Sequence, residues 1–552
     1  MPGEYRVPSR RQFLGLAAAA SALPLLGRSR AVPRTILNDA SRLNPTPVAR
    51  HISIGGAQNA DDLIARLRGE LKEAAAASRP VAASVARHSM GGQSLPRDGT
   101  AVTLDSGPLE MDGRSKLYRT SAGNRWRDII RALDPRGFSP AVMQSNSDFG
   151  VGSTFCVNAH GWPVPFGPFG STVKAIRMLL ADGTLMQCSR TENAELFSLT
   201  MGGYGLFGII IELDVEMVPN LWLEPRFERI APEKFAQSFV QTIETDKSVT
   251  MAYGRMSVAR RNFLDDALMV TYRPTRSESG ALPLADASRK LVGLTNDIYR
   301  AQTGWESAKK LRWFMETRIG PVVSGNPTTR NALLIEPVSN LAQKDLRRTD
   351  ILHEYFIAPE RFGDFLAACR EIIPKSRAEF LNVTLRYVAA DSTPVLTIAP
   401  TRRIAAVMSF SQEMTPEGEI DMMQTTEALI DRVIALGGAF YLPYRLHARR
   451  DQVEKAYPAA ASFVAAKRRY DPNLLFRNAL SAAIQPGVRP EKEHALRIER
   501  RKSFGIEFAE PGRPFFDDLR DGLVCPVQHR MLQSNRGLQE APDEDDEVRK
   551  PG

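Results

Sequence analysis

Three glycine-rich segments, each next to a β-type run, constrain the fold of this chain more than any other feature. They span residues 86–94, 149–161 and 203–208. Glycine allows positive φ angles and a close approach of the backbone to a ligand. A single segment of this kind is explained by a turn, but three within residues 86–208 are harder to explain in that way. Together they predict loops that wrap one large ligand.

The third segment contains a literal G-x-G-x-x-G, formed by Gly203, Gly205 and Gly208. A Rossmann loop leaves a strand and enters a helix, whose N-terminus holds a pyrophosphate. Here the order is reversed, because the helix-like run 195–199 precedes the glycines and the β-type run 209–213 follows them. We therefore predict a loop that lies against a flat or anionic ligand without a helix dipole. A tight helix-to-strand turn is the alternative.

The first segment directly follows the β-type run 81–85. Successive backbone N–H groups in such a turn can form an anion-binding nest. The hydroxyl groups of Ser89 and Ser94 can add donors. The segment is therefore predicted to bind a phosphate or another anion.

The order of the elements predicts an α+β fold rather than a doubly wound sheet. Between residues 38 and 219, short β-type runs alternate with glycine-rich turns and lack regular helices between them. Residues 61–77 form the exception, with apolar positions at a period near 3.6. From 222 to 447 the pattern changes to helices at 234–245, 359–373 and 425–436, alternating with strands at 249–256, 380–388 and 404–411.

The motifs together resemble a known family. A strand followed by R-H-S-M-G-G-Q-S, then G-V-G-S-T-F-C-V-N-A-H-G, A-D-G-T-L and G-G-Y-G-L-F-G-I-I, is similar to the FAD-binding domain of the vanillyl-alcohol oxidase / p-cresol methylhydroxylase superfamily, the PCMH-type FAD domain. The resemblance implies FAD as the cofactor. It also makes His88 the candidate for a covalent bond to the flavin 8α-methyl group. Because Ala86 and Arg87 replace the usual glycines before this histidine, a merely hydrogen-bonding His88 is the alternative.

The resemblance also implies which residues line FAD. The predicted cofactor-binding residues are Arg87, His88, Ser89, Met90, Gly91, Gly92, Gln93, Ser94, Gly150, Gly152, Ser153, Asn158, His160, Gly161, Gly203, Gly205, Gly208, Ile210 and Asn478. A structural role is equally open for His160. Cys156 invites comparison with relatives that attach flavin twice, but it follows Gly152 instead of preceding the turn, so we predict a buried structural thiol. Without a C-x-x-C pair, the four cysteines predict neither a zinc site nor a disulfide framework.

The second half of the chain more loosely resembles aldonolactone and alditol oxidases. Those relatives carry Glu-x-Arg on a strand of the substrate domain and a lysine near the flavin. Here Thr384 stands at the position of the glutamate, Arg386 keeps the arginine, and Arg445 stands at the position of the lysine. A guanidinium stabilises the negative charge that develops on a reduced flavin. We predict Arg445 and Arg386 for this role, with a surface or interdomain ion pair as the alternative for each. His447 and Tyr444 are the predicted proton acceptors.

These interpretations divide the chain into five parts. Residues 32–221 are predicted to form a PCMH-type FAD-binding domain of two subdomains. Residues 222–447 would form an α+β substrate or cap domain with an antiparallel sheet and an insertion or lid at 276–328. Residues 448–485 would return to the FAD-binding domain, and the charged residues 486–552 would form a solvated tail.

Residues 1–31 resemble a twin-arginine export signal. Arg10 and Arg11 precede an apolar stretch that is shorter than the ~20 residues needed to span a bilayer, and Ser29-Arg30-Ala31 forms a small-x-small cleavage site. An uncleaved arm or anchor is the alternative. The signal predicts a periplasmic or otherwise exported protein that uses the twin-arginine translocase. The net charge of +9 owes much to the five arginines of this segment, so the remainder is too mildly basic to imply nucleic acid.

The favoured function is that of an exported FAD-dependent oxidoreductase. It would oxidise an alcohol, a sugar or lactone, or a similar small substrate by hydride transfer to flavin N5, and pass electrons to oxygen or a quinone-like acceptor. Oxidation of amines, as by cytokinin dehydrogenases, is one alternative, and a flavin-binding protein without turnover is another. No metal is expected, because the seven histidines form no H-x-x-x-H pattern.

Overall fold

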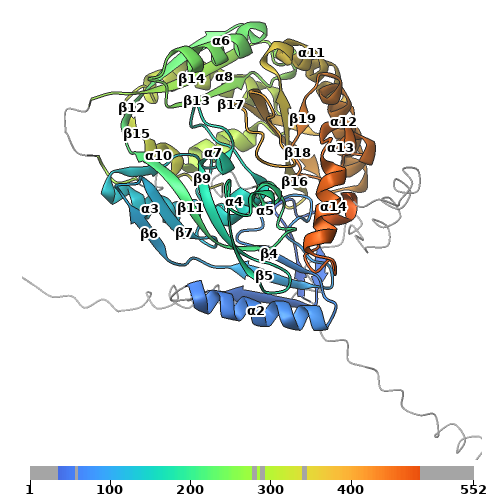
Figure 1. Cartoon of the computed structure of the whole chain (residues 1–552). Coiled ribbons are helices and arrows are strands. Elements are labelled where there is room, and N and C mark those ends of the chain that lie inside the picture. The colour runs from blue at the N-terminus through green and yellow to red at the C-terminus, as the bar shows by residue number, and fades with distance from the viewer. Residues whose placement is uncertain are drawn as a thin grey trace, which may run out of the picture. The chain divides into compact units, whose positions relative to one another are not determined.

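The computed structural model describes residues 35–55, 60–276, 282–285, 292–338, 343 and 345–484 (Figure 1). The predicted export signal at 1–31 and the predicted tail at 486–552 lie outside the described residues. In the part of the chain that is described, no helix combines the length and the apolar character needed to cross a membrane. The described residues form a mixture of helices and sheets, as the α+β prediction expected.

A small parallel sheet carries the first glycine-rich segment. It consists of β3 (Arg50–Ile54), β4 (Val81–Ser84) and β5 (Thr100–Leu104) in the order β3-β5-β4, next to a short antiparallel pair, β1 (Thr35–Leu37) and β2 (Thr46–Val48). Helix α2 (Ala60–Ala76) connects β3 to β4 and buries Leu63, Ile64, Leu67 and Leu71, which confirms the predicted helix. The first glycine-rich segment therefore begins at the carboxyl end of β4.

The other two glycine-rich segments belong to a second, antiparallel sheet. Its strands are β6 (Leu109–Asp112), β7 (Leu117–Ser121), β8 (Phe138–Pro140), β9 (Val173–Leu179), β10 (Leu185–Ser189) and β11 (Ile209–Pro219). Its helices are α3 (Trp126–Leu133), α4 (Val151–Val157) and α5 (Ala194–Thr200). The helix α5 precedes the third segment and β11 follows it, so the predicted reversal of the Rossmann order is confirmed. The second segment contains α4, a short helix that the glycine-rich sequence did not reveal.

Residues after 221 build an eight-stranded sheet in which every pairing is antiparallel. Its order is β15-β12-β14-β13-β17-β18-β16-β19. The strands are β12 (Trp222–Ile230), β13 (Met251–Met256), β14 (Ala267–Pro274), β15 (Thr328–Thr329), β16 (Arg348–Ile357), β17 (Glu379–Val388), β18 (Arg403–Glu413) and β19 (Ala439–Phe440).

The register of the eight-stranded sheet determines which polar side chains share a face. Thr384 of β17 is paired with Val407 of β18, which is paired with Glu354 of β16. Because side chains on one strand alternate between faces, Arg386 lies on the same face as Thr384 and hence as Glu354. Glu354 and Arg386 on this face contact His160 of the second glycine-rich segment.

Helices α6 (Pro232–Thr245), α11 (Phe362–Ile372) and α12 (Pro416–Ala435) cover the opposite face (Figure 1). Gly254 of β13 makes this packing possible, because a Cβ atom there would lie 2.2 Å from Cζ of Phe235. Helix α12 begins well before the predicted start at 425. Thr415 caps it by accepting a hydrogen bond from the N–H group of Gly418, and Pro416 follows at the first helical position.

The described part of the predicted insertion packs on the face of the sheet that carries Glu354 and Arg386. It forms α7 (Val292–Ala301), α8 (Glu306–Phe314), a π-helical turn and α9 (Gly320–Val323). The hydroxyl group of Tyr299 lies 2.9 Å from Oγ of Ser409 on β18. The buried ammonium group of Lys309 donates to Glu379 on β17 at 2.7 Å. These contacts make the described helices a structural layer on the sheet.

The end of the described chain returns to the parallel sheet. After α10 (Arg330–Leu334), α13 (Arg450–Ala456) and α14 (Ala460–Tyr470), residues 475–477 run beside β4. The N–H group of Val81 donates to the carbonyl of Leu475 at 2.8 Å, and Phe476 forms a parallel bridge with Val81. Helix α15 (Ala479–Ile484) follows. This return places Asn478 beside the glycine-rich segments.

Candidate functional site

The structure brings the three glycine-rich segments together. Gly150 lies so close to Val85 that a Cβ atom on Gly150 would be 2.4 Å from the Cβ of Val85. The N–H group of Tyr204 donates to the carbonyl of Cys156 at 2.8 Å. The side-chain amide of Asn478 donates to the carbonyl of Tyr204 at 3.0 Å. The first, second and third segments and the returning chain therefore form one continuous backbone cluster.

Much of the first segment is bonded within the protein. The N–H groups of Met90, Gly91 and Gly92 donate to the carbonyl of Pro443, to Oε1 of Gln93 and to Oδ2 of Asp39, at 2.9, 2.9 and 2.8 Å. The prediction of an open anion nest is therefore wrong for these three groups, and the anion that Gly92 binds is the carboxylate of Asp39. The physical reason is that the segment is clamped to residues 442–444. Gln93 completes this clamp by donating to the carbonyls of Leu442 and Tyr444 at 2.7 and 3.0 Å.

Two side chains of the first segment keep polar atoms that the described residues do not satisfy. Nδ1 of His88 and Oγ of Ser94 are buried without a hydrogen-bond partner in the described ranges. The ring of His88 meets that of Phe149 edge-on, with centroids 4.4 Å apart. Burial lowers the pKa of His88; the charge of Asp148 opposes this shift, and the charge of Arg125 adds to it. The imidazole is therefore neutral at neutral pH. A buried unsatisfied polar atom costs about 1–3 kcal/mol. Both atoms therefore fit a bound FAD that supplies their partners.

The other residues of the first segment have separate roles. Arg87 has a φ of 51°, in the left-handed region that favours glycine, and its guanidinium donates to Oγ1 of Thr103 on β5 at 3.0 Å. The positive φ explains why glycine is the usual residue at this position. The carbonyl of Ser89 accepts a hydrogen bond from the N–H group of Ala40 at 3.3 Å. The side chain of Arg87 thus points toward β5.

Most of the remaining predicted glycines permit close backbone contacts. A Cβ atom at Gly152 would lie 2.7 Å from the Cβ of Ala122, and at Gly161 it would lie 2.0 Å from a carbonyl oxygen. At Gly203 and Gly208 the corresponding distances to carbonyl oxygens are 2.1 and 2.6 Å. Gly205 differs, because it has a φ of +71° and open space beside it. Of these five glycines, Gly205 therefore has the most room beside its backbone for a ligand.

Three further predicted residues lie in regular elements or at their ends. Asn158 ends α4 with a φ of 46°, and its Oδ1 accepts from the N–H group of Gly170 at 2.9 Å. Ile210 lies in β11, paired with Met178 of β9. Ser153 lies half-buried in α4. The side-chain oxygen of Asn158 is thus engaged within the protein.

A buried polar cluster joins the second glycine-rich segment to the eight-stranded sheet. It consists of His160, Glu354, Arg386 and Tyr444, and we call it the Glu354 cluster. Nε2 of His160 is hydrogen-bonded to Oε1 of Glu354, and the hydroxyl of Tyr444 donates to Oε2 of Glu354 at 3.2 Å. Arg386 donates through Nη1 to the carbonyl of His160 at 3.2 Å and through Nη2 to Oγ of Ser145 at 2.5 Å.

Burial governs the electrostatics of the Glu354 cluster. The side chains of His160 and Glu354 are each 3% exposed. Burial lowers the pKa of Arg386, and the nearby carboxylate of Glu354 partly offsets this effect. Burial raises the pKa of Tyr444 well above its usual value, and the negative charge of Glu354 adds a smaller effect in the same direction. The guanidinium and the carboxylate therefore balance each other in a site with little water.

The Glu354 cluster has unused hydrogen-bonding capacity. Nδ1 of His160 and Nε of Arg386 are both buried and have no partner among the described residues. Unsatisfied buried polar groups in native structures often mark functional sites. An imidazole, a phenol and a carboxylate can hold or move a proton, and a fixed guanidinium can stabilise an oxygen that gains negative charge. The cluster is thus chemically equipped for the oxidation of a bound small molecule.

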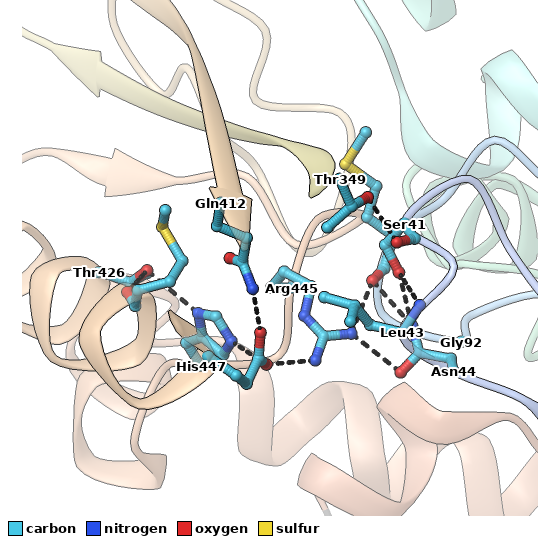
Figure 2. A network of polar contacts seen from close by, with 12 residues as sticks. Ser41, Leu43, Asn44, Gly92, Thr349, Gln412, Thr426, Arg445 and His447 are labelled. Carbon is cyan, nitrogen blue, oxygen red and sulfur yellow. Dashed lines mark hydrogen bonds and ion pairs between the residues drawn. The ribbon is translucent and has the colours of Figure 1, made fainter. Parts of the chain in front are cut away.

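Two of the predicted catalytic residues lie elsewhere, in a buried network around Glu419 that we call the Glu419 network (Figure 2). Oε1 of Glu419 on α12 accepts from Arg445 and lies 2.9 Å from Nε2 of His447. Arg445 also donates through Nη1 to Oδ1 of Asn44 at 2.9 Å and to the carbonyl of Met90 at 3.2 Å. The structure thus places Arg386 and Tyr444 in the Glu354 cluster, whereas Arg445 and His447 both contact the carboxylate of Glu419. The ion pair of Arg445 is buried and lies within residues 222–447, so it is neither at the surface nor between the predicted domains.

A third histidine belongs to the same network. The hydroxyl of Thr426 lies 3.1 Å from Nε2 of His353 and 3.1 Å from Nδ1 of His447. Burial, together with His447, lowers the pKa of His353 to about 3, although Glu419 opposes this. The ring of His353 is therefore neutral at neutral pH. The network ties α12 to residues 445–447 and to the first glycine-rich segment.

The sequence analysis missed Glu354 and Glu419 as functional candidates. A signal for Glu354 was present, because it is a carboxylate in the otherwise apolar strand residues 354–357 and follows His353. A charged side chain in a buried strand needs a partner, and the partner marks a site. Glu419 gave a weaker signal, since acidic residues are common in the first turn of a helix.

The cysteines of the described residues are free thiols that lie outside the Glu354 cluster. Cys156, Cys188 and Cys369 are free thiols, and Cys525 lies outside the described residues. Burial raises the pKa of Cys156 to about 12, which leaves it protonated and inert. Within the described ranges, no group of three His, Cys, Asp or Glu side chains could hold a metal ion.

Comparison with known proteins finds similarities to part of the chain. Residues 60–189 match the family described as "FAD binding domain". Over 155 residues the chain is 28% identical to an uncharacterized oxidoreductase of the fasciation locus of Rhodococcoides fascians, covering 28% of this chain and 35% of that relative.

Two other relatives have named activities. L-gulonolactone oxidase of Mus musculus is 28% identical over 115 residues, which is 21% of this chain and 26% of that protein. Cytokinin dehydrogenase 2 of Arabidopsis thaliana is 32% identical over 132 residues, 24% of this chain and 26% of that protein. The chain spans well under half the length of these relatives. The shared part indicates FAD as the cofactor.

Proposed function

We propose, on the premise that residues 60–189 are a FAD-binding domain, that this protein is a FAD-dependent oxidoreductase. It takes a hydride from a C–H bond beside a hydroxyl or amine group of a small substrate. The observation that carries the proposal is the position of the Glu354 cluster. His160 belongs both to this cluster and to the second glycine-rich segment, so groups suited to proton transfer adjoin the predicted cofactor loops.

Each side chain of the cluster has a definable role. FAD supplies the acceptor for the hydride. Arg386 stabilises negative charge at the reacting end of the site, and the hydroxyl of Tyr444 holds one oxygen of Glu354 in place. Burial excludes water and so strengthens these interactions. His88 and Ser94 hold the cofactor through their unsatisfied atoms.

The first test is the spectrum of the purified full-length protein. We expect a bound flavin whose visible absorbance is bleached, without oxygen, by at least one compound of a panel of L-gulonolactone, other sugars and simple alcohols. A cytokinin in the same panel tests the oxidation of amines, which the similarity to cytokinin dehydrogenase favours. Re-admission of oxygen or addition of a quinone then distinguishes an oxidase from a dehydrogenase.

Two outcomes would contradict the proposal. A colourless protein that does not bind FAD on reconstitution would exclude a flavoenzyme. A yellow protein that no compound of the panel reduces would support the alternative, a flavin-binding protein without turnover.

We further propose a covalent bond between the flavin 8α carbon and His88. The support is the neutral, half-buried imidazole with its unsatisfied Nδ1 atom. After acid precipitation, the yellow colour should stay in the pellet, and mass spectrometry should place the flavin on His88. In the variant His88→Ala the flavin should remain in the supernatant. Colour in the supernatant of the wild-type protein would show non-covalent FAD and leave the cofactor assignment intact.

Export by the twin-arginine translocase is also part of the proposal. Its support is the pair Arg10 and Arg11 before a short apolar stretch. This pathway moves folded proteins, so FAD could be inserted before export to the periplasm.

A further inference from the structure

We infer that Glu354 and His160 act as a carboxylate–imidazole pair in which Nδ1 of His160 takes the proton of a substrate hydroxyl group. This inference rests on the proposed function and adds a base and a substrate class to it. His160 is the catalytic residue of the pair, and Glu354 is its positioning residue.

The hydrogen bond between the two residues determines the tautomer of His160. An ionised carboxylate can only accept, so the hydrogen of the Nε2–Oε1 bond belongs to Nε2. In the neutral ring, Nδ1 is then the acceptor. That atom is buried and has no partner among the described residues. Glu354 thus orients the ring and leaves its basic nitrogen for a ligand, which is the arrangement of a carboxylate that supports a general base.

Glu354 is itself held firmly in place. Its second oxygen accepts from the hydroxyl of Tyr444 at 3.2 Å. The negative charge of Glu354 raises the pKa of the buried phenols of Tyr204, Tyr441 and Tyr457. It also favours the charged form of Arg386. With Arg386 as the cationic neighbour, the carboxylate stays available to balance a positive charge on the imidazole.

The unsatisfied atoms favour a hydroxyl group over a protonated amine. Nδ1 of His160 needs a donor, and Nε of Arg386 needs an acceptor. A hydroxyl group supplies both, because its hydrogen donates and its oxygen accepts. A protonated amine offers no acceptor and is repelled by the guanidinium of Arg386. The geometry therefore points to an uncharged group that both donates and accepts, and we infer an alcohol, including the hydroxyl of a sugar or lactone, as the substrate.

The oxidation balances with these groups. The O–H bond of the substrate breaks and its proton goes to Nδ1 of His160. The adjacent C–H bond breaks, its electron pair leaves with the hydrogen to FAD, and a C=O bond forms. The substrate loses two electrons and FAD gains two. The positive imidazolium is stabilised by Glu354, and the transient negative charge on the oxygen by Arg386.

A purely structural role is the competing explanation, since the pair also ties residue 160 to β16. Two measurements separate the roles. The first is nuclear magnetic resonance of the full-length protein with ¹⁵N-labelled histidine, with His160→Asn to assign the signals. We expect His160 with its proton on Nε2 and a bare Nδ1. A proton on Nδ1 in the resting protein would overturn the inference, whether or not any substrate is found.

The second measurement is the rate of flavin reduction by the alcohol or lactone of the panel that bleaches the wild-type protein. Glu354→Gln and His160→Ala should each slow this step by about 10²–10³-fold, as expected for loss of a general base. Both should keep the wild-type flavin content. Added imidazole should restore part of the rate of His160→Ala, an effect that a structural defect would not show. The control Glu379→Gln removes a carboxylate from β17 that pairs with Lys309 outside the Glu354 cluster, and should reduce flavin at the wild-type rate.

Failure of this inference differs from failure of the proposed function. If the wild-type flavin is reduced and both variants are equally fast, or if imidazole has no effect on a slow His160→Ala, the inference is wrong and the oxidoreductase stands. If only an amine reduces the flavin, the substrate class is wrong. A wild-type protein without flavin, or with flavin that no compound reduces, overturns the proposed function itself.

Discussion

Replacement of Arg386 by methionine should slow flavin reduction by about 10²–10³-fold, the usual cost of losing one preorganised charge or donor in an active site. Arg386 is the guanidinium of the Glu354 cluster, and its Nε atom is buried and unsatisfied. Its removal would leave the charge on the reacting oxygen unstabilised and the carboxylate of Glu354 without its cationic neighbour. Stopped-flow spectroscopy without oxygen measures the effect directly.

Two further variants make this prediction specific. Arg386→Lys should recover only part of the rate, because an ammonium group is a point charge and cannot donate to His160, Ser145 and a ligand from one planar fork. The control Arg402→Met removes an exposed arginine that pairs with Glu244 and Glu360, and should leave the rate unchanged. A wild-type rate in Arg386→Met would remove Arg386 from the site.

Replacement of Glu419 by alanine should lower the free energy of unfolding by about 3–5 kcal/mol, the typical cost of breaking a buried ion pair by removing one partner. The side chains of Arg445 and Glu419 are 6% and 10% exposed. Without the carboxylate, the guanidinium of Arg445 would remain buried and uncompensated, and His447 and Gln412 would lose an acceptor. Denaturant unfolding of the flavin-loaded protein, followed by circular dichroism, measures the loss.

The double variant Glu419→Gln with Arg445→Met distinguishes charge from packing. Because replacing both partners of a buried pair is often close to neutral, it should recover most of the stability lost in Glu419→Ala. The control Glu417→Gln, on the exposed side of the same helical turn, should change the free energy of unfolding by no more than about 0.5 kcal/mol. Equal stability of Glu419→Ala and the wild-type protein would show that the network contributes nothing.

The Glu419 network also shows what the sequence could not reveal about Arg445. Arg445 stands next to Tyr444, and the two were predicted to act at one site, Arg445 on the charge of the flavin and Tyr444 on the proton of the substrate. In the structure, the hydroxyl of Tyr444 reaches Glu354 on β16, whereas the guanidinium of Arg445 reaches Glu419 on α12. A motif of adjacent residues cannot show which neighbour turns to which side. That depends on the elements packed around the segment.

The glutamate expected two residues before Arg386 is a second feature that the local sequence could not locate. The resemblance to aldonolactone and alditol oxidases implied a glutamate two residues before Arg386, where Thr384 stands. The fold instead provides Glu354, which lies in the same cross-strand row as Thr384, two strands away in the sheet. Residues that are neighbours across a sheet are distant in the chain, so no local pattern could have linked Glu354 to Arg386.

By itself the sequence determined local features: several helices and strands, among them α2, α6 and α11, the reversed order around Gly203–Gly208, and the positions of the glycine-rich segments. Such features follow from periodicity, turn residues and conformational freedom over short stretches of chain. Only the tertiary structure decided that residues 90–92 bond to Asp39 and to residues 442–444, that His160 meets Glu354, and that Arg445 and His447 turn to Glu419. Hydrogen bonds and ion pairs between distant segments depend on strand register and on burial, because burial raises the free-energy cost of every unpaired polar group. Register and burial arise only when the sheets and helices are assembled.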